Sequence, residues 1–412
     1  MIELRMNALR RYFHAQIEEI RADTALRLYG AFVALGQTLG LLDWFGKNRE
    51  WYLSNQGAPI CWPLFENCFA YRFFSVSEVT TILWLYCAAS VVGALLFLFP
   101  KRCGLAYWWL IGVNVFKTLI YVQDYRLRMN QHYMLYVATA AFLLLPNKRV
   151  LLRYTLVSFY VWASFLKYNV EWLSGDTLYH NPLWVPESLI PASCVYVVLL
   201  ESFIVWGVLS SRRWIYWGAL AQLALFHVVS WPVVGNFYPL LMFALLMIFP
   251  LTLLYPHPSE PASLLRSLFT GRQPRSTYAF LACFAVLQLI PVAMPGDEKI
   301  TGEGRLFSLH MFDSRVFCSG AITLKFNDGT TQILSIPLKE TTRIRCDPAV
   351  NFSRAKGACY DHRNDQNFLD LDLYYEARRS HQKVKRPLVD VKDFCGQNLS
   401  YDLWRPNEWI KK

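Results

Sequence analysis

Residues 156–176 place a lysine near the polar end of an apolar segment; they read Leu-Val-Ser-Phe-Tyr-Val-Trp-Ala-Ser-Phe-Leu-Lys-Tyr-Asn-Val-Glu-Trp-Leu-Ser-Gly-Asp. The spacing of three to four residues predicts that four polar side chains share one helix face: Tyr160, Ser164, Lys167 and Glu171. Because polar groups cost free energy inside a membrane helix, this stripe indicates a functional site. The alternative is a lysine whose charged end merely reaches the membrane interface.

The composition indicates a chain that crosses a membrane several times. Of its 412 residues, 54% are hydrophobic and 17% are charged, whereas about a quarter of a soluble domain is charged. About nine apolar segments approach the length that spans the hydrocarbon: 24–45, 78–100, 104–122, 132–146, 150–170, 191–210, 214–231, 236–255 and 277–295. The sequence therefore predicts an all-α polytopic membrane domain over residues 24–295, embedded in a lipid bilayer.

Basic residues predict the orientation of these segments. The expected inner connections carry Lys101-Arg102, Lys148-Arg149, Arg212-Arg213 and the arginines 266, 272 and 275. Residues 1–23 are expected to form an amphipathic segment on the inner surface. The N-terminus would then be cytoplasmic and residues 296–412 periplasmic or lumenal. Topology accounts for most of the net charge of +11, so no nucleic-acid partner is expected.

Ten cysteines divide by side of the membrane. Four lie in or beside the expected spans and are interpreted as packing residues: Cys87, Cys103, Cys194 and Cys283. Six fall on the expected outer side, which indicates disulfides in an oxidising compartment: Cys61, Cys68, Cys318, Cys346, Cys359 and Cys395. The sequence does not choose among their pairings. A zinc site is the alternative, but the chain has no Cys-x-x-Cys pair, so no metal is expected.

Residues 296–412 have the composition of a small soluble α/β or mainly-β domain. Residues 321–326 and 330–336 flank Asp328-Gly329, which predicts a β-hairpin, and 368–375 predict a further strand.

Three titratable residues from three expected spans reach one depth near the outer surface: His132, Lys167 and His227. Such a ring, lined by aromatic residues, suits a lipid-soluble aromatic ligand such as a quinone. Glu201 lies inside a span and is expected to be neutral or paired, either as a structural partner or as part of a proton relay.

The segment from Phe165 to Gly175 resembles the vitamin K-dependent γ-carboxylase family, whose membrane part is the horizontally transferred transmembrane (HTTM) domain. The family carries there a lysine, an acid–Trp pair four to five residues later and then a glycine, as this chain does. Asn130-Gln131-His132 is similar to the family's Asn-Asn-His, and Phe226-His227 to its Phe-His. Looser matches in residues 304–308 and 325–329 extend the resemblance over nearly the whole chain.

The resemblance implies a function. Lys167, aided by His132, would deprotonate a reduced vitamin K (phylloquinol or menaquinol). Reaction with O2 would then give a strong base that takes a proton from glutamate in a secreted protein or peptide, and the carbanion would capture CO2. The resemblance implies that four residues bind the quinone: Tyr160, Asn130, Gln131 and His227.

Three further assignments follow from the resemblance alone. Arg315 and Arg379 fall where the family has arginines near the glutamate and CO2 site. Cys61 resembles a cysteine that bonds to the outer domain, which would make Cys346 or Cys359 its partner.

The chain also departs from the family. Aromatic residues and a histidine are replaced around Ile300, Arg305 and Asp313, and the chain lacks most of the region expected to recognise a propeptide. These departures affect glutamate carboxylation more than quinol chemistry. Two alternatives stay open: another quinone-linked oxidoreductase, for example one acting on thiols, and a non-enzymatic HTTM maturation factor for secreted peptides.

Overall fold

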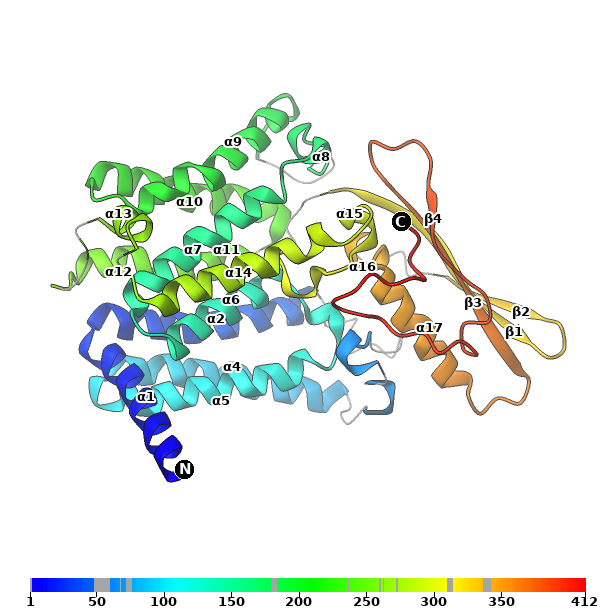
Figure 1. Ribbon diagram of the computed structural model, residues 1–412, viewed down its shortest axis with the longest axis horizontal. Coiled ribbons are helices and arrows are strands. Elements are labelled where there is room, and N and C mark those ends of the chain that lie inside the picture. The colour runs from blue at the N-terminus through cyan, green and yellow to red at the C-terminus, as the bar shows by residue number, and fades with distance from the viewer. Residues whose placement is uncertain are drawn as a thin grey trace.

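A helical bundle and a twisted sheet form the two parts of the computed structural model (Figure 1). The structure describes residues 2–47, 60–66, 68–71, 76–178, 184–235, 237–258, 261, 263–271, 273–309, 314–335 and 342–412. Arg272 and Asp313 lie outside these residues.

The bundle contains the described helices of the first three quarters of the chain: α1 (Ile2–Ala22), α2 (Thr24–Lys47), α4 (Val76–Leu98), α5 (Cys103–Tyr121), α6 (Asn130–Leu144), α7 (Lys148–Phe165), α8 (Val170–Leu173), α9 (Ile190–Ser202), α10 (Arg213–Val234), α11 (Phe237–Leu246), α12 (Ile248–Leu254), α13 (Leu264–Phe269) and α14 (Arg275–Ala293). The second part, called the outer part here because it lies outside the bundle, contains α15 (Glu298–Thr301), β1 (Val316–Phe326), β2 (Thr331–Ser335), α16 (Thr342–Arg345), α17 (Pro348–His362), β3 (Phe368–Arg379) and β4 (Arg386–Val391).

Seven segments among the described residues are long and apolar enough to cross a membrane: Thr24–Leu42, Thr80–Leu98, Pro100–Tyr121, Glu187–Leu209, Arg213–Val234, Phe237–Leu254 and Arg275–Ala293. The chain is thus a multi-pass membrane protein. The two other expected spans are α6 and α7, which lie within the bundle (Figure 1). α6 has 15 residues and extends about 22 Å, against about 30 Å of hydrocarbon. α7 carries Lys148, Arg149 and Arg153 in its first turns.

The basic pair that opens α7 is buried, although the sequence suggested an inner loop. Lys148 is fully buried and contacts Gln16 and Glu19 of α1. Arg149 donates two hydrogen bonds to Asp23, at 3.0 and 2.8 Å. These ion pairs fasten the start of α7 to the α1–α2 corner, so the two cations have a structural role beside any effect on orientation.

The polar stripe in the opening segment is divided by a break, so the prediction that its four residues share one helix face is wrong: Lys167 lies in the turn after α7 and Glu171 in the next helix. α7 ends at Phe165, and Asn169 then adopts an extended conformation and caps α8 by accepting a hydrogen bond from the amide of Trp172. An Asn at this position begins a new helix because its side chain satisfies a free amide. Tyr160 and Ser164 remain on α7, whereas Glu171 belongs to α8 and turns toward the outer part.

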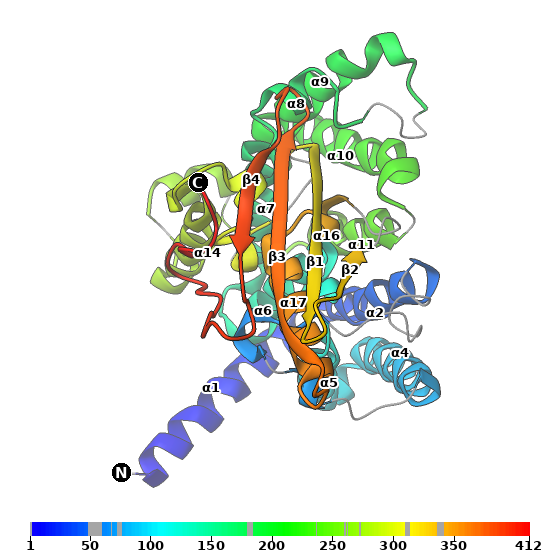
Figure 2. The same cartoon turned by 90° about the vertical axis from the view of Figure 1, so that its right-hand side faces the viewer.

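The outer part is a four-stranded antiparallel sheet in the order β2-β1-β3-β4. Gly329, at a φ of 81°, closes the expected hairpin, in which Lys325 pairs with Thr331. The hairpin and the strand at 368–375 are confirmed. α17 packs on the face of the sheet that is turned toward the bundle, while the other face is open (Figures 1 and 2). Leu371, Leu373 and Phe352 belong to this core.

Three disulfides join the six cysteines that were expected on the outer side: Cys61–Cys68, Cys318–Cys346 and Cys359–Cys395. Their oxidation agrees with the expectation, but a bond from Cys61 to Cys346 or Cys359 is wrong. Cys68 follows Cys61 by seven residues, whereas Cys346 bonds to β1 and Cys359, on α17, bonds to Cys395. The amide of Cys61 instead donates a hydrogen bond to Ser353 of α17. The four remaining cysteines are free; three are buried and Cys283 is exposed.

This pairing predicts how the chain separates after a single cut. A protease site inserted after Gly296 should yield two fragments that separate on a denaturing gel without reductant, because no disulfide joins residues 1–296 to 297–412. The control is a site at Gly329, inside the loop closed by Cys318 and Cys346, where the fragments should stay joined until reduction. One unreduced band after the first cut would contradict the pairing.

Candidate functional site

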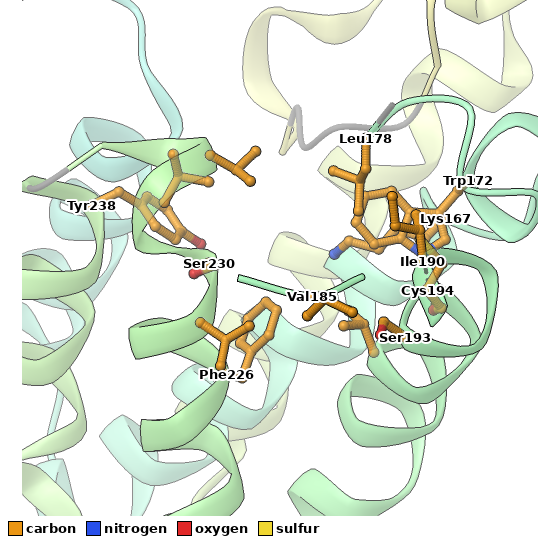
Figure 3. A pocket seen from close by; sticks show the side chains of 14 residues that line it. Lys167, Trp172, Leu178, Val185, Ile190, Ser193, Cys194, Phe226, Ser230 and Tyr238 are labelled. Atoms are coloured by element: carbon orange, nitrogen blue, oxygen red, sulfur yellow. Dashed lines mark hydrogen bonds between the residues drawn. The ribbon is translucent and has the colours of Figure 1, made fainter. Parts of the chain in front are cut away.

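An apolar pocket lies between α9 and α10, with Lys167 and Trp172 in its wall (Figure 3). It holds about 740 Å³ of space, part of which is open to the outside. The remaining described side chains that line it are Leu178, Val185, Ile190, Ser193, Cys194, Val197, Phe226, Val229, Ser230, Val233, Val234 and Tyr238. Its wall is therefore hydrocarbon apart from an amine, a thiol, an indole and a few hydroxyl groups.

Lys167 begins in the turn after α7 and is held by an ion pair inside the bundle. Its Nζ lies 2.6 Å from Oε2 of Glu201 on α9, and both side chains are only 3% exposed. The carbonyl of Ala163 accepts a second hydrogen bond at 3.3 Å, and the Trp172 ring centroid lies 5.2 Å away. Glu201 is therefore paired, which is one of the two states expected for it. A charged pair this deep depends on both members, because either one alone would be an uncompensated charge.

A second polar pair lies beside the first. The hydroxyl of Tyr160 on α7 is 2.6 Å from Nε2 of His227 on α10, and both residues are buried. Phe226, Tyr238 and Phe243 surround the imidazole with their rings. The structure thus brings Lys167, Tyr160 and His227 into one region, as the sequence predicted, and adds Glu201 and Tyr238 to them.

His132 is placed elsewhere in the bundle. It lies on α6 against α2 and α5, where a side chain on Gly40 would come within 2.8 Å of its ring and Tyr121 lies 6.0 Å away between centroids. None of Asn130, Gln131 and His132 is among the described lining residues of the pocket. Gln131 is nearly buried and donates to the sulfur of Met129. The catalytic role expected for His132 and the quinone-binding role expected for Asn130 and Gln131 therefore stay predictions that the described pocket does not support.

The sequence interpretation overlooked Lys117, another buried lysine of the bundle. Lys117 on α5 is fully buried, donates to Oε1 of Gln37 at 3.0 Å and lies 4.3 Å above the Tyr136 ring. No carboxylate pairs with it among the described residues. Gln37 also accepts from Tyr86 and donates to Thr139. Lys117 thus belongs to a separate polar cluster of α2, α4, α5 and α6, and its lone position within an apolar span was the available sequence signal.

Arg379, at the end of β3, holds Glu171 in a two-pronged ion pair. Arg379 Nε lies 2.5 Å from Oε1 of Glu171, its Nη2 contacts Oε2, and Asp297 lies 3.4 Å from Nη1. His381 Nδ1 is 2.9 Å from the same carboxylate. Burial disfavours the charge of Glu171, but the hydrogen bonds from Arg379 outweigh it and lower the pKa of Glu171.

Arg315 is the other expected arginine, and it also faces an acid of the loop after α7. Its Nη1 lies 3.5 Å from Oδ1 of Asp176, and its guanidinium lies 5.0 Å from the Phe317 ring centroid. Both arginines therefore join the outer part to the segment 171–176, which begins four residues after Lys167. The sequence did not identify Glu171 and Asp176 as the partners of the two arginines, nor His381 as a neighbour of Glu171, because these contacts join segments far apart in the chain.

The described residues contain no group of three or more His, Cys, Asp or Glu side chains that could hold a metal ion. Comparison with family models, curated proteins and solved structures finds no match to this chain.

Removal of Arg379 should weaken the contact between the outer part and the bundle. Arg379→Ala leaves Glu171 as a buried, largely unpaired charge, so the free energy of unfolding should fall by about 3–5 kcal/mol. Adding Glu171→Gln should recover most of this loss because the charge is removed too. The control is Arg386→Ala on β4, an exposed arginine, expected to change stability by about 0.5 kcal/mol or less. Chemical denaturation in detergent measures all four proteins.

The same ion pair predicts an acid-dependent loss of stability. Because the pKa of Glu171 is lowered in the folded protein, its stabilising effect is complete above the unfolded value of about 4.3. It is lost as the pH falls through the folded pKa. The stability difference between the wild type and Glu171→Gln should therefore shrink on acidification. A difference that stays constant down to the folded pKa would contradict this assignment.

Proposed function

We propose that this chain is an integral-membrane enzyme of the vitamin K-dependent γ-carboxylase type, which oxidises a hydroquinone with O2 to drive CO2 addition to a glutamyl side chain. The observation that carries the proposal is the amine of Lys167 in the wall of an apolar pocket, beside the Glu201 carboxylate. An amine in a dry, largely hydrocarbon pocket suits a ligand with an aromatic body and an acidic hydroxyl.

The pocket wall supports binding of reduced vitamin K. Phe226, Val229 and Ile190 offer apolar contacts for its rings, and Ser193, Ser230 and Tyr238 offer hydroxyl groups. When bound, the hydroquinone supplies a phenolic proton and the capacity to react with O2. Lys167 takes the proton, and the low polarity of the surroundings keeps water from competing with that transfer.

Tyr160 and His227 have a supporting role in this proposal. Their hydrogen bond at 2.6 Å fixes the imidazole next to the region of Lys167. Tyr238 lies 5.9 Å from the imidazole, between ring centroids, and also lines the pocket. The pair thereby orients a wall residue that can hydrogen-bond to a quinol oxygen. His132 is not among the described residues that line the pocket, and it packs against α2 and α5.

The proposal for the carboxylation half rests on the outer basic residues. Arg379, His381 and Arg315 line the side of the sheet that meets the segment after Lys167. A guanidinium binds a carboxylate through two parallel hydrogen bonds, and Glu171 demonstrates that Arg379 has the geometry for it. A glutamyl substrate from the periplasm or lumen would use the same chemistry, so it would have to compete with Glu171.

The first experiment measures oxygen-dependent conversion of reduced vitamin K to its epoxide by the purified protein in lipid nanodiscs. Wild type should turn over, and Lys167→Met should lose activity by about 100-fold or more, the usual contribution of a positioned base. Lys117→Met is the matched control, because it removes another buried lysine of the same bundle, and it should keep turnover within about threefold.

Two results would count against the proposal. Folded wild type without epoxide formation would contradict the quinol reaction and favour a maturation factor for secreted peptides. Equal losses of turnover from Lys167→Met and Lys117→Met would show that removing either buried lysine disturbs folding, and that Lys167 has no special role in the reaction. If turnover depends on Lys167, incorporation of labelled CO2 into a glutamyl peptide tests the second half.

A further inference from the structure

Glu201 is the buried acid behind the proposed base. It lies at the end of α9, is 2% exposed and faces Lys167 at 2.6 Å. The heavy-atom positions suit two forms of the pair: an ammonium with a carboxylate, or an amine with a carboxylic acid. In water the charged form is strongly favoured. In a dry interior the loss of hydration offsets much of that preference, so the two forms lie closer in free energy.

This pairing raises a chemical difficulty for Lys167 as a base. A lysine that forms an ammonium with Glu201 has no free electron pair, so it accepts a proton only after releasing one. Its nearest acceptors are the carboxylate of Glu201 at 2.6 Å and the carbonyl of Ala163 at 3.3 Å. A carboxylate is far more basic than an amide carbonyl. Glu201 is therefore the group that can receive the proton.

Resting on the proposed function, we infer that Glu201 is the final proton acceptor of the site and that Lys167 conducts the proton to it. An O–H bond of the hydroquinone breaks as an N–H bond forms at Lys167. Another N–H bond of Lys167 breaks as an O–H bond forms at Glu201. No electrons are transferred in this step.

The charge balance of this step adds no net charge to a dry pocket. Before transfer the site holds an ammonium, a carboxylate and a neutral ligand; afterwards it holds an ammonium, a carboxylic acid and a negative charge on the ligand oxygen. The net charge is zero in both states. The negative charge moves from one partner of Lys167 to another, so it remains next to the ammonium where low polarity strengthens the attraction.

Among the described residues, no second carboxylic acid lies beside the pair to take the proton in place of Glu201. The titratable groups that face it are Tyr160 on α7, His227 on α10 and Tyr238 on α11. Each is buried or half-buried, and His227 already shares a hydrogen bond with Tyr160. Cys194 of α9 also lies near Lys167. In water an imidazole is more basic than a carboxylate, but the Nε2 of His227 is bonded to Tyr160, whereas Glu201 is the group of this set that is hydrogen-bonded directly to Lys167 among the described residues.

Infrared difference spectroscopy under argon tests the acceptor directly. Addition of reduced vitamin K to the wild type in nanodiscs should produce the C=O stretching band of a protonated carboxyl group. The band should be absent from Glu201→Gln and from Lys167→Met. Glu201→Asp keeps an acceptor, so it should give a band at a changed frequency. That shift identifies the residue even if Glu201→Gln does not fold.

Turnover under air gives a second measure. Glu201→Gln should form epoxide at least tenfold more slowly, while its affinity for the quinol, followed by tryptophan fluorescence quenching, should stay within about twofold of the wild type. A substitution that only disturbed the structure would lower both the rate of epoxide formation and the affinity for the quinol. The double variant Lys167→Met with Glu201→Met should be as stable as the wild type, because an apolar pair replaces the ions, yet inactive.

The two measurements separate the two proposals. A band in the wild type without any epoxide would support Glu201 as the acceptor and contradict the oxygen reaction. Epoxide formation by Glu201→Gln at a rate within twofold of the wild type would overturn the role of Glu201 and leave the proposed function intact. A wild type that binds quinol without producing the band would also overturn that role.

Discussion

The buried ion pair between Lys167 and Glu201 is the interaction on which the arrangement of this molecule depends. It joins the turn after α7 to α9 in the bundle interior, where an unpaired charge would be expensive. The pocket exists beside this pair because α9 and α10 provide apolar walls next to it. This pair joins two segments of the bundle, and it is also the only ion pair made by the described residues that line the pocket.

The break after Phe165 gives two charges near each other in the sequence opposite environments. Lys167 remains inside the bundle, whereas Glu171 leaves it and pairs with Arg379 of the sheet. Glu171, which holds the outer part, therefore follows Lys167, the proposed proton-transfer residue, by only four positions in the chain. Movement of α8 would affect both, since Trp172 packs near the Lys167 amine and lines the pocket. The position of the sheet and the shape of the pocket are physically linked.

Several candidate residues could be recognised from the sequence because each violates a local expectation. Lys167 and Glu201 are charges within apolar segments, and the cost of burying them requires partners. The sequence could not show that they are partners of each other, since 34 residues separate them. For His132 the inference from equal depth was misleading: residues at one depth around a bundle can face different helices, and His132 faces α2 and α5.

The sequence by itself determined the membrane character, the hairpin at Asp328-Gly329 and the oxidation of six cysteines. Each follows from local properties: apolar length, turn chemistry and cysteine number. The tertiary structure alone decided that Cys61 bonds to Cys68, that Glu171 forms an ion pair with Arg379, and that α6 and α7 lie within the bundle. These outcomes depend on which distant segments meet, and that is fixed by packing of the whole chain and the cost of leaving any buried charge without a partner.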